Sequence, residues 1–78
     1  MTKVAFRTLI EEVLNVPPGT LTDADSRNSV EDWSSLVDVQ ILAMIASELG
    51  VQPDQQLQEY DTVGDLLDLL ERRGALAG

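Results

Sequence analysis

The stretch from Asp32 to Gly50, DWSSLVDVQILAMIASELG, constrains the fold more than any other part of the sequence. Its apolar residues recur at the three- and four-residue spacing of an α-helix, and Gly50 stands where such a helix would end. Ser34 stands at the N-cap position, where a side-chain oxygen accepts a backbone N–H of the first turn. We expect the arc that faces the core to consist of Val39, Leu42, Ile45, Ala46 and Leu49.

The opposite face of this helix is also apolar, and carries Leu36, Val37, Ala43 and Met44. A small helical domain cannot bury both faces fully, so we expect the outer face to be exposed. Exposed apolar surface of this kind marks a partner or ligand site. The alternative is a helix that is buried deep among its neighbours.

An earlier helix is expected over residues 3–14. Its apolar face consists of Phe6, Leu9, Ile10 and Val13. Arg7 and Glu11 are spaced to form an ion pair on another face. Pro17, Pro18 and Gly19 then stop the helix, because proline lacks the backbone N–H that a helix interior needs.

A loop follows over residues 15–34, and it is longer than most connections in small domains. We expect Leu21, Val30 and Trp33 to anchor it, with the Trp33 ring as a buried plug. The alternative for Trp33 is a contact beside a reactive position.

The C-terminal part predicts a short helix around residues 54–59, anchored by Leu57 and Tyr60. Thr62 and Asp65 then have the spacing of a capping box, with Asp in place of Glu, at the start of a last helix. The buried face expected for that helix is Val63, Leu66, Leu67 and Leu70.

The end of the last helix is expected at Gly74, with Asp68 and Arg72 paired along it and residues 75–78 as a frayed tail. The prediction is an all-α fold, a small four-helix bundle of three main helices plus one short helix, with the long loop between helices I and II. We expect the 78 residues to form a single domain. If the first and last helices pack side by side and antiparallel, the basic ends of the chain leave the loop and the middle helices negative.

Composition excludes several kinds of function. The net charge of -9 disfavours nucleic acid, which proteins bind by neutralising phosphates, and favours partners with basic surfaces. The chain has no Cys and no His, so disulfides, thiolate metal sites and His-dependent catalytic triads are absent. No stretch has the apolar length of a signal peptide or membrane span, so we expect a cytoplasmic, monomeric protein that does not bind membranes.

No arrangement of residues favours catalysis or a metal site. The acids Asp23, Asp25, Glu31 and Asp32 lack the paired spacing of glycosidases and the offsets of a calcium loop, and we interpret them as surface carboxylates. With Ser34 as the cap, the Ser35 hydroxyl would stand at the first helical position, pointing outward. Two interpretations stay open on local chemistry: the serines only start a helix, or Ser35 carries a phosphodiester that the helix N-terminus stabilises.

Three motifs resemble those of acyl carrier proteins, and the likeness covers nearly the whole chain. They are Trp33-Ser34-Ser35-Leu36 in the place of W-D-S-L, the helix end Glu48-Leu49-Gly50-Val51, and Thr62-Val63-Gly64-Asp65-Leu66. The resemblance implies 4′-phosphopantetheine esterified to Ser35, whose thiol would hold acyl groups as thioesters. It also implies a non-catalytic protein served by a phosphopantetheinyl transferase.

The resemblance assigns roles to further residues. Partner enzymes, namely acyltransferases, adenylating enzymes or ketosynthases with basic or apolar docking surfaces, would contact Leu36, Val37, Asp38, Gln40, Met44 and Glu48. The candidates for the acyl pocket are Val39, Leu42, Ile45 and Leu66.

The chain departs from the family in two ways. Ser34 replaces the motif's Asp, and Gln40, Ala46 and Ser47 stand where many fatty-acid carriers have Glu. These changes favour polyketide or other specialised metabolism, and the lack of His before the serine disfavours a peptidyl carrier. The alternative is an unmodified acidic helical adaptor that binds a protein partner through helix II.

Overall fold

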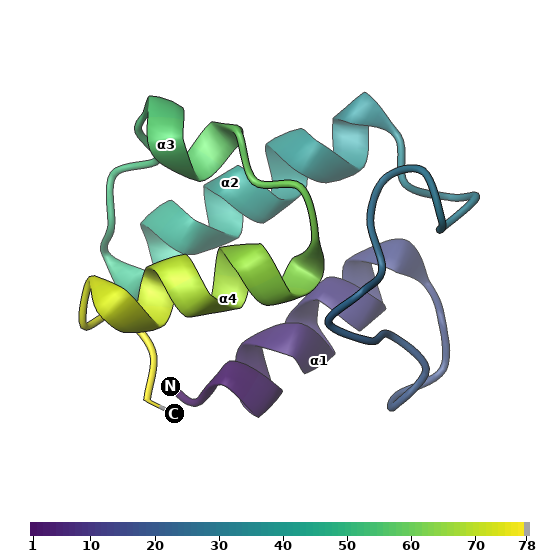
Figure 1. Ribbon diagram of the computed structural model, residues 1–78, viewed down its shortest axis with the longest axis horizontal. Helices are drawn as coiled ribbons and strands as arrows, with labels where there is room; N and C mark the ends of the chain where they lie inside the picture. Colours follow the sequence, from purple (N-terminus) through teal and green to yellow (C-terminus); the bar gives the residue numbers. More distant parts are fainter. Residues whose placement is uncertain (78) are drawn as a thin grey trace.

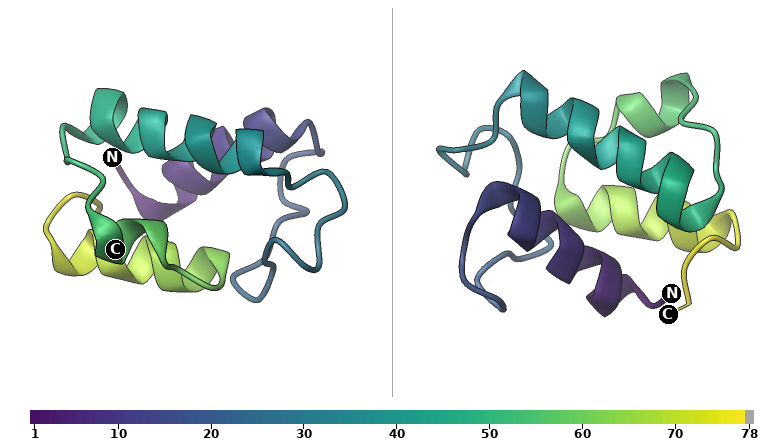
Figure 2. Two further views of the ribbon diagram at one scale, coloured as in Figure 1. Left: turned by 90° about the horizontal axis from the view of Figure 1, so that it is seen from above. Right: turned by 180° about the vertical axis from the view of Figure 1, so that it is seen from behind.

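Four α-helices carry the fold in the computed structural model, which describes residues 1–77. They are α1 (Lys3–Leu14), α2 (Ser35–Leu49), α3 (Gln55–Gln58) and α4 (Val63–Arg72), and these residues contain no strand beyond isolated bridges (Figure 1). The fold is therefore all-α, as the sequence predicts. The α1 helix packs against both α2 and α4, and it runs antiparallel to each of them (Figure 2).

Local capping determines where the helices begin. The Thr2, Ser34, Asp54 and Thr62 side chains each accept a backbone N–H from the first turn of α1, α2, α3 and α4 respectively. At α4 the Asp65 carboxylate also accepts the Thr62 N–H, which completes the predicted capping box. Gly50 ends α2 with a positive φ of 65°, as expected for a C-terminal glycine.

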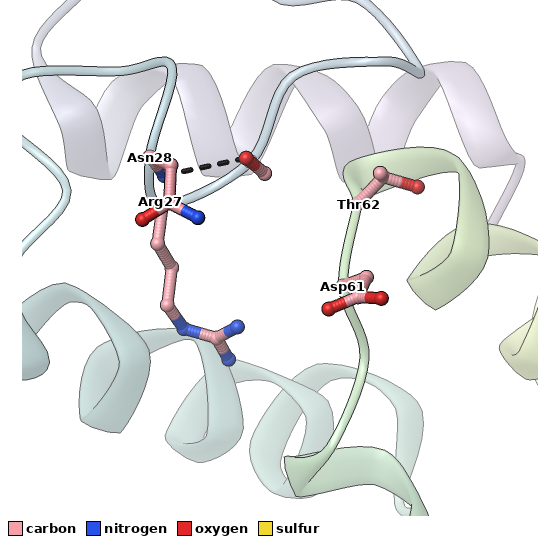
Figure 3. Close-up of a pocket in the computed structure, with 5 residues that line it drawn as sticks. Arg27, Asn28, Asp61 and Thr62 are labelled. Atoms are coloured by element: carbon pink, nitrogen blue, oxygen red, sulfur yellow. Dashed lines mark hydrogen bonds between the residues drawn. The ribbon is translucent and has the colours of Figure 1, made fainter.

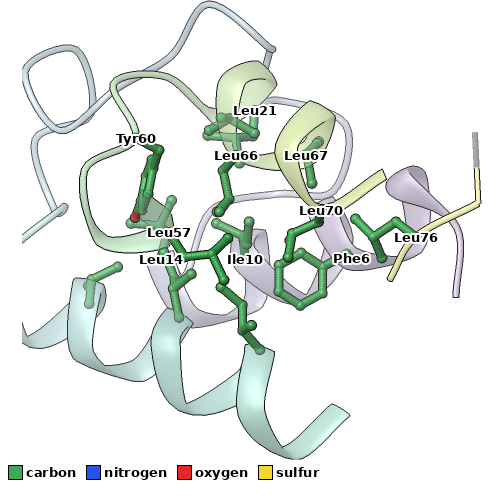
Figure 4. Close-up of a cluster of buried hydrophobic side chains, with 14 of the residues drawn as sticks. Phe6, Ile10, Leu14, Leu21, Leu57, Tyr60, Leu66, Leu67, Leu70 and Leu76 are labelled. Carbon is green, nitrogen blue, oxygen red and sulfur yellow. The ribbon is translucent and has the colours of Figure 1, made fainter. Parts of the chain in front are cut away.

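The core is aliphatic apart from the rings of Phe6, Trp33 and Tyr60. Figure 4 shows the aliphatic side chains together with Phe6 and Tyr60. Phe6, Ile10 and Leu14 form the buried stripe of α1, while Leu9 and Val13 pack at its edge. The α4 face is buried as predicted, with Val63, Leu66, Leu67 and Leu70 each at most 1% exposed. Trp33 is buried, which confirms it as a plug for the loop, and Leu21, Leu57 and Tyr60 are buried as anchors.

The core-facing arc predicted for α2 is wrong except at Ile45, which is fully buried. Its buried residues are Val37, Ile41 and Ile45, whereas Val39 is 61% exposed, Ala46 is exposed, and Leu42 and Leu49 are half-buried. Because α2 is apolar on nearly every side, its periodicity alone does not select one face. Packing against α1 makes that choice.

The first half of the long loop is tied to α1 and α4. Glu11, which is 2% exposed, accepts the backbone N–H groups of Gly19 at 2.8 Å and Leu21 at 3.0 Å through Oε2. The predicted pair of Arg7 with Glu11 is therefore wrong, and Arg7 instead donates to Asp23 at 2.6 Å. The loop thus supplies the partners of both side chains: backbone N–H groups for Glu11 and the Asp23 carboxylate for Arg7.

The loop also lies directly against the start of α4. The backbone N–H of Gly64 donates to the Asp23 carbonyl at 2.9 Å, and that of Val63 donates to the Asp25 carbonyl at 2.9 Å. A Cβ atom on Gly64 would lie 2.8 Å from the Asp23 Cβ. Glycine is needed here because only a residue without a side chain permits this approach.

Two expectations for the end of the chain are wrong. Leu76 is buried, and Ala77 exchanges backbone hydrogen bonds with Met1 and Lys3 at 2.8 and 3.0 Å, so residues 75–77 are not a frayed tail. The tail prediction for Gly78 lies outside the described residues. The Asp68 carboxylate is bonded by Lys3 of α1 rather than by Arg72, because the antiparallel packing places Lys3 beside it.

Candidate functional site

The two serines at the start of α2 have different environments. Ser34 has an extended backbone, and its Oγ accepts the Val37 N–H at 3.4 Å while its carbonyl accepts the Asp38 N–H at 3.2 Å. Ser35 is the first helical residue and is exposed, and its hydroxyl makes no hydrogen bond to residues 1–77. The division into a cap and a free hydroxyl is the one expected from the sequence.

Asp38, one turn further along α2, joins the helix to two other segments. Its Oδ2 accepts from Arg27 Nε at 2.7 Å, and its Oδ1 accepts from Trp33 Nε1 at 2.7 Å and from the Tyr60 hydroxyl at 3.2 Å. Burial alone would raise the pKa of Asp38, but the hydrogen bonds from Arg27 and Trp33 outweigh it and hold that pKa below its ordinary value. The carboxylate therefore stays charged and bonded within the protein.

The aromatic rings complete this cluster. The Arg27 guanidinium lies 4.4 Å from the centre of the Tyr60 ring, and its Nη1 donates to the Tyr60 carbonyl at 2.9 Å. The Trp33 and Tyr60 ring centres are 6.3 Å apart and tilted by 49°. Burial, together with the negative charge of Asp38, raises the pKa of the Tyr60 hydroxyl, which remains a donor.

The sequence did not indicate this cluster. Asp38 was expected as a partner contact on the surface, but three internal donors occupy its oxygens. One signal was available, since buried Trp and Tyr side chains usually find a partner for their polar atoms. Asp38 is the acid of α2 nearest to Trp33 in the sequence.

The exposed face of α2 differs in part from the expected partner surface. Leu36 and Val39 are 66% and 61% exposed, and they lie on one side of the helix with Gln40 and Ala43, which are also exposed. Glu48 is exposed as well. Val37 is buried at 7% exposure against the core, so its place on that surface is a wrong expectation.

Met44 was also expected on the partner surface, but it is only half exposed because it packs against the core. We call the side that remains, formed by Leu36, Val39, Gln40 and Ala43, the outer face of α2. This face begins directly beside Ser35.

The four candidates for an acyl pocket do not line a common cavity. Ile45 and Leu66 are fully buried and Leu42 is half-buried, but Val39 points to solvent on the outer face. One open pocket of about 370 Å³ lies between the loop and the segment before α4, lined by Ser26, Arg27, Asn28, Asp61 and Thr62 (Figure 3). A second, of about 290 Å³, is lined by Ala46, Gly50, Val51, Gln52 and Pro53. None of the four candidates lines either pocket.

Ion pairs place basic side chains beside acids of the middle and last helices, which the distribution of charge along the sequence does not indicate. Lys3 pairs with Asp68 and Glu71 of α4, Arg27 with Asp38 of α2, and Arg73 with Asp54 at the start of α3. The middle helices are thus partly neutralised by basic residues from elsewhere in the chain. Glu31 and Asp32, next to the serines, are exposed and form no ion pair with residues 1–77.

Residues 1–77 contain no group of three or more His, Cys, Asp or Glu side chains arranged to hold a metal ion. Over the same residues, no helix has both the length and the apolar character to cross a membrane. No protein-family model, curated protein or solved structure matches the chain.

Proposed function

We propose that the protein is a discrete acyl carrier protein, a four-helix bundle that carries 4′-phosphopantetheine on Ser35. The observation that carries the proposal is the exposed Ser35 hydroxyl at the first position of α2, which makes no hydrogen bond to residues 1–77 and lies beside a separate serine that caps the helix. The Ser34 hydroxyl already accepts the Val37 N–H, so the Ser35 hydroxyl is not used as the cap and stays available as an attachment point.

The attachment is a phosphoryl transfer that the helix geometry favours. Ser35 Oγ would attack the pantetheine-side phosphorus of coenzyme A, the P–O bond to adenosine 3′,5′-bisphosphate would break, and the transferase would take the serine proton. The product places a negative phosphodiester at the N-terminus of α2, where unpaired N–H groups and the helix dipole stabilise negative charge. Acyl groups would then be held on the terminal thiol as thioesters and passed between biosynthetic enzymes, while the carrier itself performs no catalysis.

The outer face of α2 supports docking of these enzymes. Leu36 and Val39 are the two most exposed large apolar side chains of α2. Glu31 and Asp32, which form no ion pair with the described residues, precede Ser35 at the end of this face. Such a surface fits a partner with an apolar centre and basic residues at its edge. We keep specialised metabolism, with polyketide synthesis as the leading case, as the proposed pathway class because Gln40 and Ser47 replace acids on this side of the helix.

The test is modification of the purified chain by coenzyme A and a broad-specificity phosphopantetheinyl transferase, followed by intact mass measurement. We expect one phosphopantetheine increment on the wild type and on Ser34→Ala, and none on Ser35→Ala. A wild-type chain without the increment would refute the carrier function. An increment that persists in Ser35→Ala and disappears in Ser34→Ala would move the site by one residue.

A second candidate is an unmodified adaptor that binds a basic protein partner through the outer face of α2. The observation favouring it is the apolar exposure of Leu36 and Val39 together with the absence of an Asp beside Ser35. In this case Val39→Lys abolishes partner binding, Ser35→Ala leaves it unchanged, and Val4→Lys, at a comparably exposed position of α1, serves as the matched control. Loss of function in Ser35→Ala would reject the adaptor.

A further inference from the structure

The long loop has two halves that are held by different contacts. The first half, residues 15–25, is bonded to Glu11 and Arg7 of α1 and to the start of α4. The second half, residues 26–34, leads directly to Ser35, and its side-chain bonds to α2 all end on Asp38 or on the Ser34 cap. One carboxylate therefore holds the segment through which the chain enters the Ser35 site.

The same carboxylate reaches a third segment, the connection between α3 and α4. The Tyr60 hydroxyl donates to Asp38, Arg27 donates to the Tyr60 carbonyl, and an isolated bridge pairs Ser26 with Thr62. The second half of the loop, α2 and the α3–α4 connection are thus joined around one charged group. The Asp38 side chain is 25% exposed, which is less than the acid in each of the other ion pairs of residues 1–77, while Arg27 at 34% is as open to solvent as their basic partners.

We infer that Asp38 is a positioning residue for the Ser35 site. Its hydrogen bonds hold residues 26–34 and Tyr60 against α2, so that a modifying or acyl-transferring enzyme binds one fixed surface around Ser35. The inference rests on the carrier function proposed above. Arg27, Trp33 and Tyr60 all donate to the same carboxylate, so loss of its charge weakens all three hydrogen bonds together. Residues 15–25, the first half of the loop, make no hydrogen bond to Asp38.

Asp38→Asn is the informative substitution. An asparagine keeps the side-chain oxygen that accepts from Trp33 and Tyr60, but its NH₂ group would face Arg27 Nε, donor against donor. The charge-assisted bond to Arg27 is lost while the volume of the side chain is preserved. Any local opening is then attributable to the lost charge rather than to a cavity.

The experiment measures amide hydrogen exchange and modification kinetics on the same variants. For Asp38→Asn we expect exchange about tenfold faster in residues 26–34 and around Tyr60, with α1 and α4 unchanged. We expect KM of the transferase for the variant to rise at least about fivefold with kcat unchanged, because only the locked fraction binds productively.

Asp23→Asn is the matched control, because it breaks an Asp–Arg pair in the first half of the same loop. It should leave exchange in residues 26–34 and KM unchanged. The inference is overturned if Asp38→Asn exchanges like the wild type, if it loosens all helices equally, if Asp23→Asn gives the same pattern, or if KM stays at the wild-type value. A wild-type chain that is never modified refutes the carrier function itself, and that outcome is distinct from a modified wild type with an unaffected Asp38→Asn variant.

Discussion

Replacement of Glu11 by Gln tests how the buried carboxylate supports the loop. In the wild type, Glu11 Oε2 accepts the N–H groups of Gly19 and Leu21 at 2.8 and 3.0 Å, at a site only 2% exposed. The Gln oxygen can accept both bonds, but they become neutral ones, and an NH₂ group is buried in place of Oε1. Charge-assisted bonds are about twice as strong as neutral ones, which contribute about 1 kcal/mol each, so the loss is about 2 kcal/mol.

Chemical denaturation followed by far-UV circular dichroism measures this loss, since small domains of this size usually unfold in two states. A decrease of about 2 kcal/mol corresponds to a fall in Tm of roughly 8–16 °C. Glu12→Gln is the control, because Glu12 is exposed and its substitution should change stability by less than about 0.5 kcal/mol. If the two variants are equally stable, the carboxylate of Glu11 does not hold the loop and the reasoning is refuted.

Three further predictions concern the loop, α4 and pH. Gly64→Ala should lower the free energy of unfolding by about 1–3 kcal/mol in urea denaturation, because a Cβ would lie 2.8 Å from the Asp23 Cβ. Thr62→Ala should cost about 1 kcal/mol in the same assay by removing the 3.1 Å bond from the Asp65 N–H, whereas Thr62→Ser should retain most of it. The pKa of Asp38 is lowered in the folded protein, so its carboxylate stabilises the fold above the ordinary value of 3.8, and this stabilisation is lost as pH falls through the folded-state pKa. In acid denaturation, Asp38→Asn should therefore show a weaker dependence of the unfolding free energy on pH than the wild type. An unchanged acid profile would contradict this.

Helix positions could be predicted from the sequence because they depend on neighbouring residues. Ser34, Thr62 and Gly50 act on backbone groups within one turn, and α1 and α2 begin and end where the sequence indicates. The same reason explains why the capping of α2 by Ser34 could be predicted. Whether Ser34 caps and leaves the Ser35 hydroxyl free is decided by local backbone geometry.

The partners of charged side chains could not be predicted in this way. Local spacing suggested Arg7 with Glu11 and Asp68 with Arg72, yet the loop supplies Asp23 to Arg7 and α1 supplies Lys3 to Asp68. A pair within an exposed helix gains only a few tenths of a kcal/mol, so any well-placed tertiary partner outweighs it. Spacing along a helix therefore limits which pairs are possible without selecting among them.

The sequence by itself determined the all-α class, the ends of the helices and the free serine at the start of α2, because backbone capping and apolar periodicity act within a few residues. Tertiary structure decided which side of α2 is buried, since Val37 and Ile41 are buried while Val39 is exposed on a helix that is apolar on nearly every side. It also decided that Asp38 accepts hydrogen bonds from Arg27 and Trp33 of the loop and from Tyr60. Both outcomes depend on groups brought together from distant parts of the chain, and no local pattern records them.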